Sequence, residues 1–142
     1  MPSNSGIGAR VRRKEDARLL AGKAQFVGDL SLPGLWEVAF VRSPVAHGRL
    51  RGVTKPEGAE ACVLVAADME GLRPIRALSS LPSYRASDYP ALAVDKVRFV
   101  GECIALCMAP SRAEAEDLAE RVELDIEPLP PLVDVEAARA EG

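Results

Sequence analysis

Most hydrophobic positions of the chain fall into short runs of strand character. Some runs alternate apolar and polar residues, and others are continuously apolar, as in strands that are covered on both faces. Pro44 ends the first run, because proline has no N–H to donate to a β-ladder. The pattern predicts strands over residues 35–42, 48–53, 61–66, 92–100, 103–109 and 122–126.

One amphipathic helix is clearly predicted, over residues 112–121. Ser111 and Glu114 have capping-box spacing, in which the serine hydroxyl accepts from the N3 amide and the glutamate reaches back to the serine amide. Apolar residues then recur at i, i+3, i+4 and i+7, which gives one apolar face. Shorter helices are predicted over residues 14–21 and 135–140. Strands mixed with helices, without a repeat, predict an α+β (mixed α/β) fold.

The least regular stretch is residues 72–91, which we expect to be a long loop. Loops of this length in compact domains are usually functional or bound to a partner. Residues 1–8 are rich in serine and glycine and predict a flexible lead-in. The remaining residues, 9–142, are the length of one domain, and we expect them to fold as one.

Composition places the protein among ordinary globular domains. Of its 142 residues, 48% are hydrophobic and 27% are charged, so global disorder is not expected. No apolar run approaches the ~18 residues of a membrane span, and the N-terminus lacks the apolar core of a secretory signal. Three cysteines are too few for a disulfide scaffold and favour a reducing compartment. We therefore expect a cytoplasmic protein with no membrane span.

Charge is divided unevenly along the chain. Residues 1–55 hold ten Lys/Arg and four Asp/Glu, whereas residues 56–142 hold eight and seventeen. A basic segment can bind nucleic acid, but none of the six aromatic residues lies within the basic cluster to stack on bases. We therefore expect no nucleic-acid partner, and we interpret the basic half as a solvated face or a protein-binding surface.

Candidate catalytic and metal-binding groups are few. Cys62, Cys103, Cys107 and His47 could form a Cys3His zinc site, but two of the cysteines are four residues apart within an apolar strand, which is the wrong spacing for a zinc knuckle. Such a strand raises the pKa of a thiol, which disfavours a catalytic cysteine. The motif Gly6-Ile-Gly8 follows no predicted strand and lacks the third glycine of a dinucleotide fingerprint.

A small hydrolase that uses Ser43, His47 and an acid is a further hypothesis. No G-x-S-x-G elbow surrounds the serine, so a structural or interface histidine is favoured. Gly101 and Glu102 are expected to form a hairpin or bulge. A carboxylate at this break in the strand could serve chemistry, but we favour Glu102 bonded to backbone amides. The residues alone therefore predict no self-sufficient active site.

Several ordered stretches together resemble a known family. The segments VRSPVAH, DKVRFVGE and EPLPPLVD carry most of the likeness, which extends over residues 7–30, 32–50, 63–72 and 92–134. In this order and spacing, they resemble the N-terminal a/b hammerhead domain of the molybdenum hydroxylase large subunit. That family includes xanthine dehydrogenase, aldehyde oxidase and aerobic carbon monoxide dehydrogenase. The resemblance implies an a/b hammerhead-like fold.

The resemblance also implies a function without a catalytic residue here. Large subunits of the family continue for several hundred residues, and their molybdopterin-binding segments and catalytic glutamate correspond to no part of this chain. We therefore expect a non-catalytic structural domain or small subunit that binds no metal or cofactor itself. Its expected partner is a molybdopterin-binding large chain, with iron–sulfur and FAD groups on partner chains. The implied reaction is oxidative hydroxylation, in which water supplies the oxygen and molybdenum accepts the electrons.

A docking surface is expected on the basic N-terminal arm, the 72–91 loop and the Arg42–His47 turn. If the enzyme context is wrong, the alternative is a stand-alone or vestigial binding module that kept the hammerhead fold without redox activity. The candidate interface residues are Arg12, Arg13, Arg42, Ser43, His47, Gly101 and Glu102.

Overall fold

A computed structural model describes residues 6–7, 9 and 13–140. Its contacts form two compact units, one ending at Leu35 and the other beginning at Trp36, and each is described by itself. The predicted lead-in over residues 1–8 falls mostly outside the described residues. The single domain over residues 9–142 stays a prediction.

The first unit contains the short helix α1, Asp16–Leu20. The amide of Gly22 bonds the carbonyl of Leu19 (3.1 Å), and that of Lys23 bonds Arg18 (2.9 Å), which is a Schellman ending. Gly22 has a φ of 65°, a conformation that glycine adopts without strain. The helix predicted over residues 14–21 is confirmed, but it is shorter at both ends. The 3-10 turn η1, Val27–Asp29, follows it.

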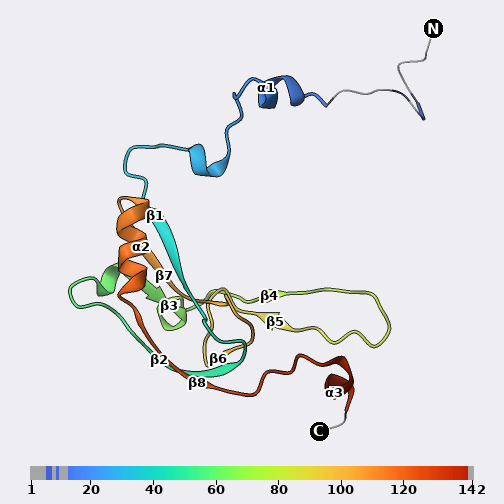
Figure 1. Cartoon of the computed structure of the whole chain (residues 1–142), viewed down its shortest axis with the longest axis vertical. Helices are drawn as coiled ribbons and strands as arrows, with labels where there is room; N and C mark the ends of the chain where they lie inside the picture. Colours follow the sequence, from blue (N-terminus) through green and yellow to red (C-terminus); the bar gives the residue numbers. More distant parts are fainter. Residues whose placement is uncertain (1–5, 8, 10–12, 141–142) are drawn as a thin grey trace. The chain divides into compact units, whose positions relative to one another are not determined.

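The second unit begins with a three-stranded antiparallel sheet of order β1-β7-β3 (Figure 1). Its strands are β1, Glu37–Arg42, the central β7, Cys103–Ala109, and β3, Val63–Val65. In β1, Ala39 and Val41 are buried while Phe40 is exposed, as the two-residue period of a half-covered strand requires. The strands predicted over residues 35–42 and 103–109 are confirmed.

A second antiparallel sheet has the order β6-β2-β8. It consists of β6, Lys96–Val97, β2, Gly48–Thr54, and β8, Glu123–Pro128. Val97 of this sheet is completely buried, and it forms a core cluster with Ile104 and Ala93. The strands predicted over residues 48–53 and 122–126 are confirmed with small shifts of their ends.

Helix α2, Arg112–Glu120, packs against β1 and β7 (Figure 1). It buries Ala115 and Leu118, which lie on the predicted apolar face. Its cap differs in one bond from the predicted capping box: the Ser111 hydroxyl accepts from the Glu114 amide (3.3 Å) but also donates to the Glu114 carboxylate (2.8 Å). The core below the helix consists of small and branched side chains: Val41, Val63, Ala105, Cys107, Leu118 and Val122.

The prediction of a continuous strand over residues 61–66 is wrong in its extent. Only β3 is extended, and 3-10 turns flank it: η2, Glu60–Cys62, and η3, Ala66–Asp68. The Asp68 carboxylate accepts from the amide of Val65 (2.8 Å) and from the ammonium of Lys55 (2.7 Å). These bonds turn the chain out of the sheet after three residues.

The strand predicted over residues 92–100 is also mostly wrong. Only β6 is extended, because the backbone amide of Arg98 donates to the Glu102 side chain and bends the chain into a turn. Gly101, with a φ of 89°, completes that turn. The hairpin or bulge expected at Gly101 and Glu102 is therefore a turn stabilised by a carboxylate.

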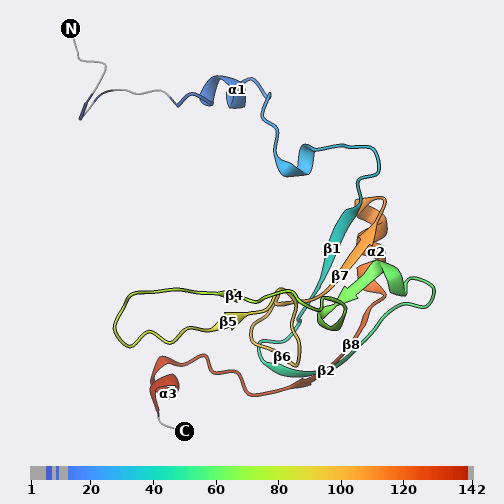
Figure 2. The ribbon, with the colours of Figure 1, turned by 180° about the vertical axis from the view of Figure 1, so that it is seen from behind.

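Residues 72–91, predicted to be a loop, contain a two-stranded hairpin that we call the β4–β5 arm. Strand β4, Ile75–Arg76, pairs antiparallel with β5, Asp88–Tyr89. An ion pair between Arg76 Nε and Asp88 Oδ1 (2.9 Å) spans the ladder. Figures 1 and 2 both show the arm reaching beyond the two three-stranded sheets.

The described chain ends in helix α3, Val135–Arg139, which confirms the helix predicted over residues 135–140. Asp134 caps it by accepting from the amide of Ala137 (2.8 Å). Within the described residues, no helix has both the length and the apolar character that crossing a bilayer requires.

The stability of the second unit is expected to fall as the pH drops below about 4. The bonds from Lys55 and then from Val65 hold the pKa of Asp68 below its ordinary 3.8. The folded-state pKa is thus the lower one, so the stabilisation is complete above the unfolded value and is lost as the pH falls through the folded value. Thermal melting across this range should show a weaker pH dependence for Asp68→Asn. The control Asp117→Asn, at an exposed position of α2, should keep the wild-type dependence.

Candidate functional site

The loop after β1 and the turn before β7 form one structure. The amide of Ser43 bonds the carbonyl of Glu102 (2.9 Å), and the amide of Gly101 bonds the carbonyl of Ser43 (2.8 Å). The guanidinium of Arg42 donates to the carbonyl of Gly101 (2.9 Å). Four predicted interface residues, almost sixty positions apart in sequence, are therefore adjacent in space.

The Ser43 side chain is fully used within its own loop. It is 2% exposed, and its hydroxyl donates to the carbonyl of Val45 (2.8 Å) and accepts from the amide of that residue (3.2 Å). A nucleophilic serine instead needs its proton directed toward a base. The geometry therefore gives Ser43 a structural role and does not support the hydrolase hypothesis.

Glu102 is the only charged side chain among the described residues that is buried, with 2% exposure. It accepts from the backbone amide of Arg98 and from the guanidinium of the same residue (2.9 Å). The predicted bonding of this carboxylate to backbone is confirmed. Its role is to hold the turn that positions Phe99 and Val100 at the surface.

His47 attaches the C-terminal segment to this loop. Its Nδ1 lies 2.9 Å from the carbonyl of Pro130, and its own carbonyl accepts from the amide of Leu129 (2.9 Å). A carbonyl can only accept, so Nδ1 is the donor in this contact. The histidine thus holds the segment after β8 against the Arg42–His47 turn.

A groove of ≈ 350 Å³ lies beside this histidine, and we call it the His47 groove. Its walls come from the turn before β7 and from the proline-rich segment after β8. Leu132 is 67% exposed and Val133 is 86% exposed, so much apolar surface faces outward. The groove is lined by Ala46, His47, Arg98, Phe99, Val100, Pro131, Leu132 and Val133.

The His47 groove connects to the β4–β5 arm through an aromatic pair. The rings of Tyr89 and Phe99 are stacked, with centroids 6.1 Å apart. Sequence reasoning missed this continuity, because Phe99 was assigned to a strand and residues 72–91 to a loop. The clustering of Phe99, Leu132 and Val133 has no local sequence signal.

All six aromatic side chains of the protein are exposed. Their exposed fractions run from 41% to 66%, and the buried core contains no aromatic residue. Aromatic rings normally contribute large buried areas, and they are enriched in protein–protein interfaces. In the described residues, the aromatic side chains therefore lie at the surface and do not fill the core. The six residues are Phe26, Trp36, Phe40, Tyr84, Tyr89 and Phe99.

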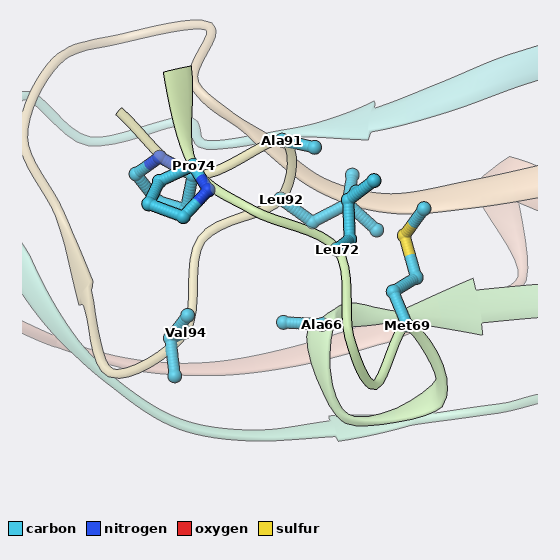
Figure 3. A pocket seen from close by; sticks show the side chains of 8 residues that line it. Ala66, Met69, Leu72, Pro74, Ala91, Leu92 and Val94 are labelled. Atoms are coloured by element: carbon cyan, nitrogen blue, oxygen red, sulfur yellow. The ribbon is translucent and has the colours of Figure 1, made fainter. Parts of the chain in front are cut away.

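A smaller pocket of ≈ 230 Å³ lies at the base of the arm (Figure 3). Met69, Leu72 and Leu92 gather on one side of it, with Pro74 and Val94 on the other. Its lining has no polar side chain that could orient a reacting group. The pocket can accept an apolar group, but it offers no chemistry.

The remaining predicted groups do not form a site. Among residues 13–140 and the few described before them, no three His, Cys, Asp or Glu side chains are close enough to hold a metal ion. Burial raises the pKa of the Cys107 thiol, as predicted, and the sulfur of Cys103 accepts from Arg42 (3.2 Å). Arg13 pairs with Asp16 (3.1 Å), while Arg12 lies outside the described residues.

Comparison with known proteins shows the family to which the chain belongs. The profile "Aldehyde oxidase and xanthine dehydrogenase, a/b hammerhead domain" matches residues 21–130. The chain is 39% identical to the nicotine 6-hydroxylase large subunit of Paenarthrobacter nicotinovorans, over 90% of this chain and 16% of that protein.

Solved structures agree with this match. Quinoline 2-oxidoreductase from Pseudomonas putida 86 has a TM-score of 0.80 at 37% identity, over 90% of this chain and 17% of that one. A Cu,Mo-CO dehydrogenase has a TM-score of 0.77 at 36% identity, over 94% and 17%. The chain thus spans about a sixth of the length of these relatives.

Proposed function

The chain belongs to the aldehyde oxidase and xanthine dehydrogenase family as its a/b hammerhead domain, and we propose that it is a non-catalytic structural domain of a molybdenum-dependent hydroxylase. In this role it docks on a molybdopterin-binding chain, and iron–sulfur and flavin groups reside on partners. The observation that carries the proposal is the exposure of all six aromatic residues. The predicted cytoplasmic location is part of the same proposal.

The exposed aromatic residues favour a protein partner over a solvated surface. A Phe, Tyr or Trp side chain buries roughly 150–250 Å² when it is covered. Tyr89, Phe99 and the His47 groove form one connected apolar surface. Covering this surface with another chain stabilises both partners, whereas a monomer leaves it in water.

The part played by this chain is positioning. The molybdenum that molybdopterin holds on the partner chain would supply the acceptor for the electrons of the substrate. The described residues offer no cluster of ligands that fits such a metal. They instead hold a docking surface in place, through the bonds of Ser43, the buried Glu102 and the contact of His47 with Pro130.

Purification of the tagged chain from its own cells tests the proposal. We expect a molybdopterin-binding chain to co-purify in equal amount, identified by mass spectrometry, together with molybdenum and iron in elemental analysis. A metal-free monomer would contradict the proposal and favour the stand-alone binding module.

Leu132→Asp and Val133→Asp in the His47 groove are each expected to weaken co-purification at least about tenfold, because each places an unpaired charge in an apolar interface. Leu132→Met is the matched control: it keeps the apolar volume and should retain the partner. Circular dichroism should show the same fold for all three variants, since both side chains are mostly exposed. Equal recovery from Leu132→Asp and Leu132→Met would exclude this groove from the interface.

A further inference from the structure

The β4–β5 arm exposes an unusual amount of apolar surface. Every residue from 71 to 89 is exposed, and the ladder that holds the arm together has only two residue pairs. An isolated two-stranded hairpin is at best marginally stable in water. The large apolar residues of the arm are Leu72, Ile75, Leu78, Leu81, Tyr84 and Tyr89, with exposed fractions from 41% to 88%.

The arm is also a positively charged segment within an acidic half of the chain. Residues 72–91 hold three arginines and one aspartate, while the rest of residues 56–142 holds five Lys/Arg and sixteen Asp/Glu. Arg76 pairs with Asp88 across the ladder. Neither Arg73 nor Arg85 has a carboxylate partner among the described residues, so both are available to a second chain.

The surroundings of the arm extend its apolar surface. The stacking of Tyr89 on Phe99 connects it to the His47 groove, and the apolar pocket of Figure 3 lies at its base. A partner that covers Phe99 in the groove therefore also lies next to Tyr89 of the arm. Because the chain matches only about a sixth of its relatives, the remaining part of such an enzyme offers a large surface for this contact.

We propose that the arm docks into an apolar groove with a rim of carboxylates on the molybdopterin-binding chain. Its apolar residues fill that groove, while Arg73 and Arg85 pair with the carboxylates and fix the orientation of the arm. This inference rests on the proposed function, and it adds the contact segment and the chemistry of the partner surface. A second copy of this chain is the competing occupant, because its own acidic residues could also attract the arm.

Photo-crosslinking in the full chain, expressed in its own cells, tests the contact. A photo-reactive residue replaces Leu78, which is 88% exposed, or Ala61, an exposed control on the 3-10 turn η2. We expect crosslinks from position 78, and not from position 61, to an Asp- or Glu-containing peptide of the molybdopterin-binding chain. Crosslinks to a second copy, or none from position 78 while the two chains co-purify, would overturn the proposal.

Charge reversal tests the role of the arginines. The double variant Arg73→Glu with Arg85→Glu is expected to reduce co-purification of the molybdopterin-binding chain at least about tenfold, and added salt should weaken wild-type binding. Replacing both arginines with lysine keeps the charge and should preserve most binding. The double variant Arg121→Glu with Arg139→Glu, at exposed positions outside the arm, controls for the same change in net charge. If the glutamate variant binds as wild type does, the proposal for the arm is wrong, while the proposed function of the chain is unaffected. If the wild-type protein captures no molybdopterin-binding chain, the proposed function is wrong, and the proposal for the arm is wrong with it.

Discussion

Replacing Gly48 with alanine is expected to lower the free energy of unfolding by about 2 kcal/mol. A Cβ at this position would lie 2.6 Å from Cγ2 of Ile126 and 3.0 Å from the carbonyl oxygen of Glu127. That methyl group is attached to a β-branched Cβ with few alternative rotamers, and the carbonyl belongs to the paired strand β8, so neither moves cheaply. Urea unfolding followed by circular dichroism measures the loss.

Gly52 on the same strand provides the matched control. A Cβ there meets nothing within 4 Å, so Gly52→Ala should remain within about 0.5 kcal/mol of wild type. If the two substitutions lower the free energy of unfolding equally, the loss of glycine from the backbone of β2 would be the cause. The explanation by steric contact with β8 would then be wrong. The same difference should appear in binding, because Gly48 adjoins His47 and fixes where β2 meets β8.

Local sequence signals were enough to predict an element when the residues of that element alone determine its structure. The serine cap and apolar face of α2 predicted the helix, and the apolar run of β7 predicted the central strand. These signals depend on neighbours within one helical turn or one strand, which can be read directly from a sequence. The pattern also correctly indicated that Glu102 bonds to the backbone.

The predictions failed where a side-chain bond, and not the hydrophobic pattern, determines the local structure. Residues 92–100 have strand character, but the bond from the Arg98 amide to Glu102 bends them into a turn. The apolar run over residues 61–66 ends early because Lys55, from the end of β2, helps Asp68 close a 3-10 turn. Neither of these side-chain bonds produces a hydrophobic period that a sequence pattern could show.

The proposed docking surface combines residues from segments that are far apart in the sequence, and whether it is an interface stays a prediction. Conspicuous residues such as Arg42, Ser43 and His47 were singled out, and the structure brings them together with the turn before β7. Phe99, Leu132 and Val133 form the exposed surface itself, yet apolar residues in a sequence are normally assigned to the core. Only the fold shows that small and branched side chains fill the core and leave the aromatic residues outside.

Glu102→Ala is expected to lower the free energy of unfolding by about 2–3 kcal/mol. The substitution removes both bonds that the buried Glu102 side chain makes to Arg98, so the part-buried backbone N–H of Arg98 loses its acceptor. Glu102→Gln keeps an oxygen that can accept from that N–H but loses the charge that faces the guanidinium. We therefore expect glutamine to cost about half as much as alanine. Urea unfolding of the three proteins measures both differences.

The pair Arg112 and Glu116 on α2 tests whether burial or ion pairing causes the loss of stability in Glu102→Ala. It has the same i,i+4 spacing, but its side chains are 70% and 53% exposed, whereas Glu102 is 2% exposed. An exposed pair contributes roughly 0.3–0.5 kcal/mol, because water and ions screen it. Glu116→Ala should therefore cost less than about a quarter of Glu102→Ala. Equal costs would mean that the buried carboxylate does not hold the turn, and the positions of Phe99 and Val100 at the proposed docking surface would then need another cause.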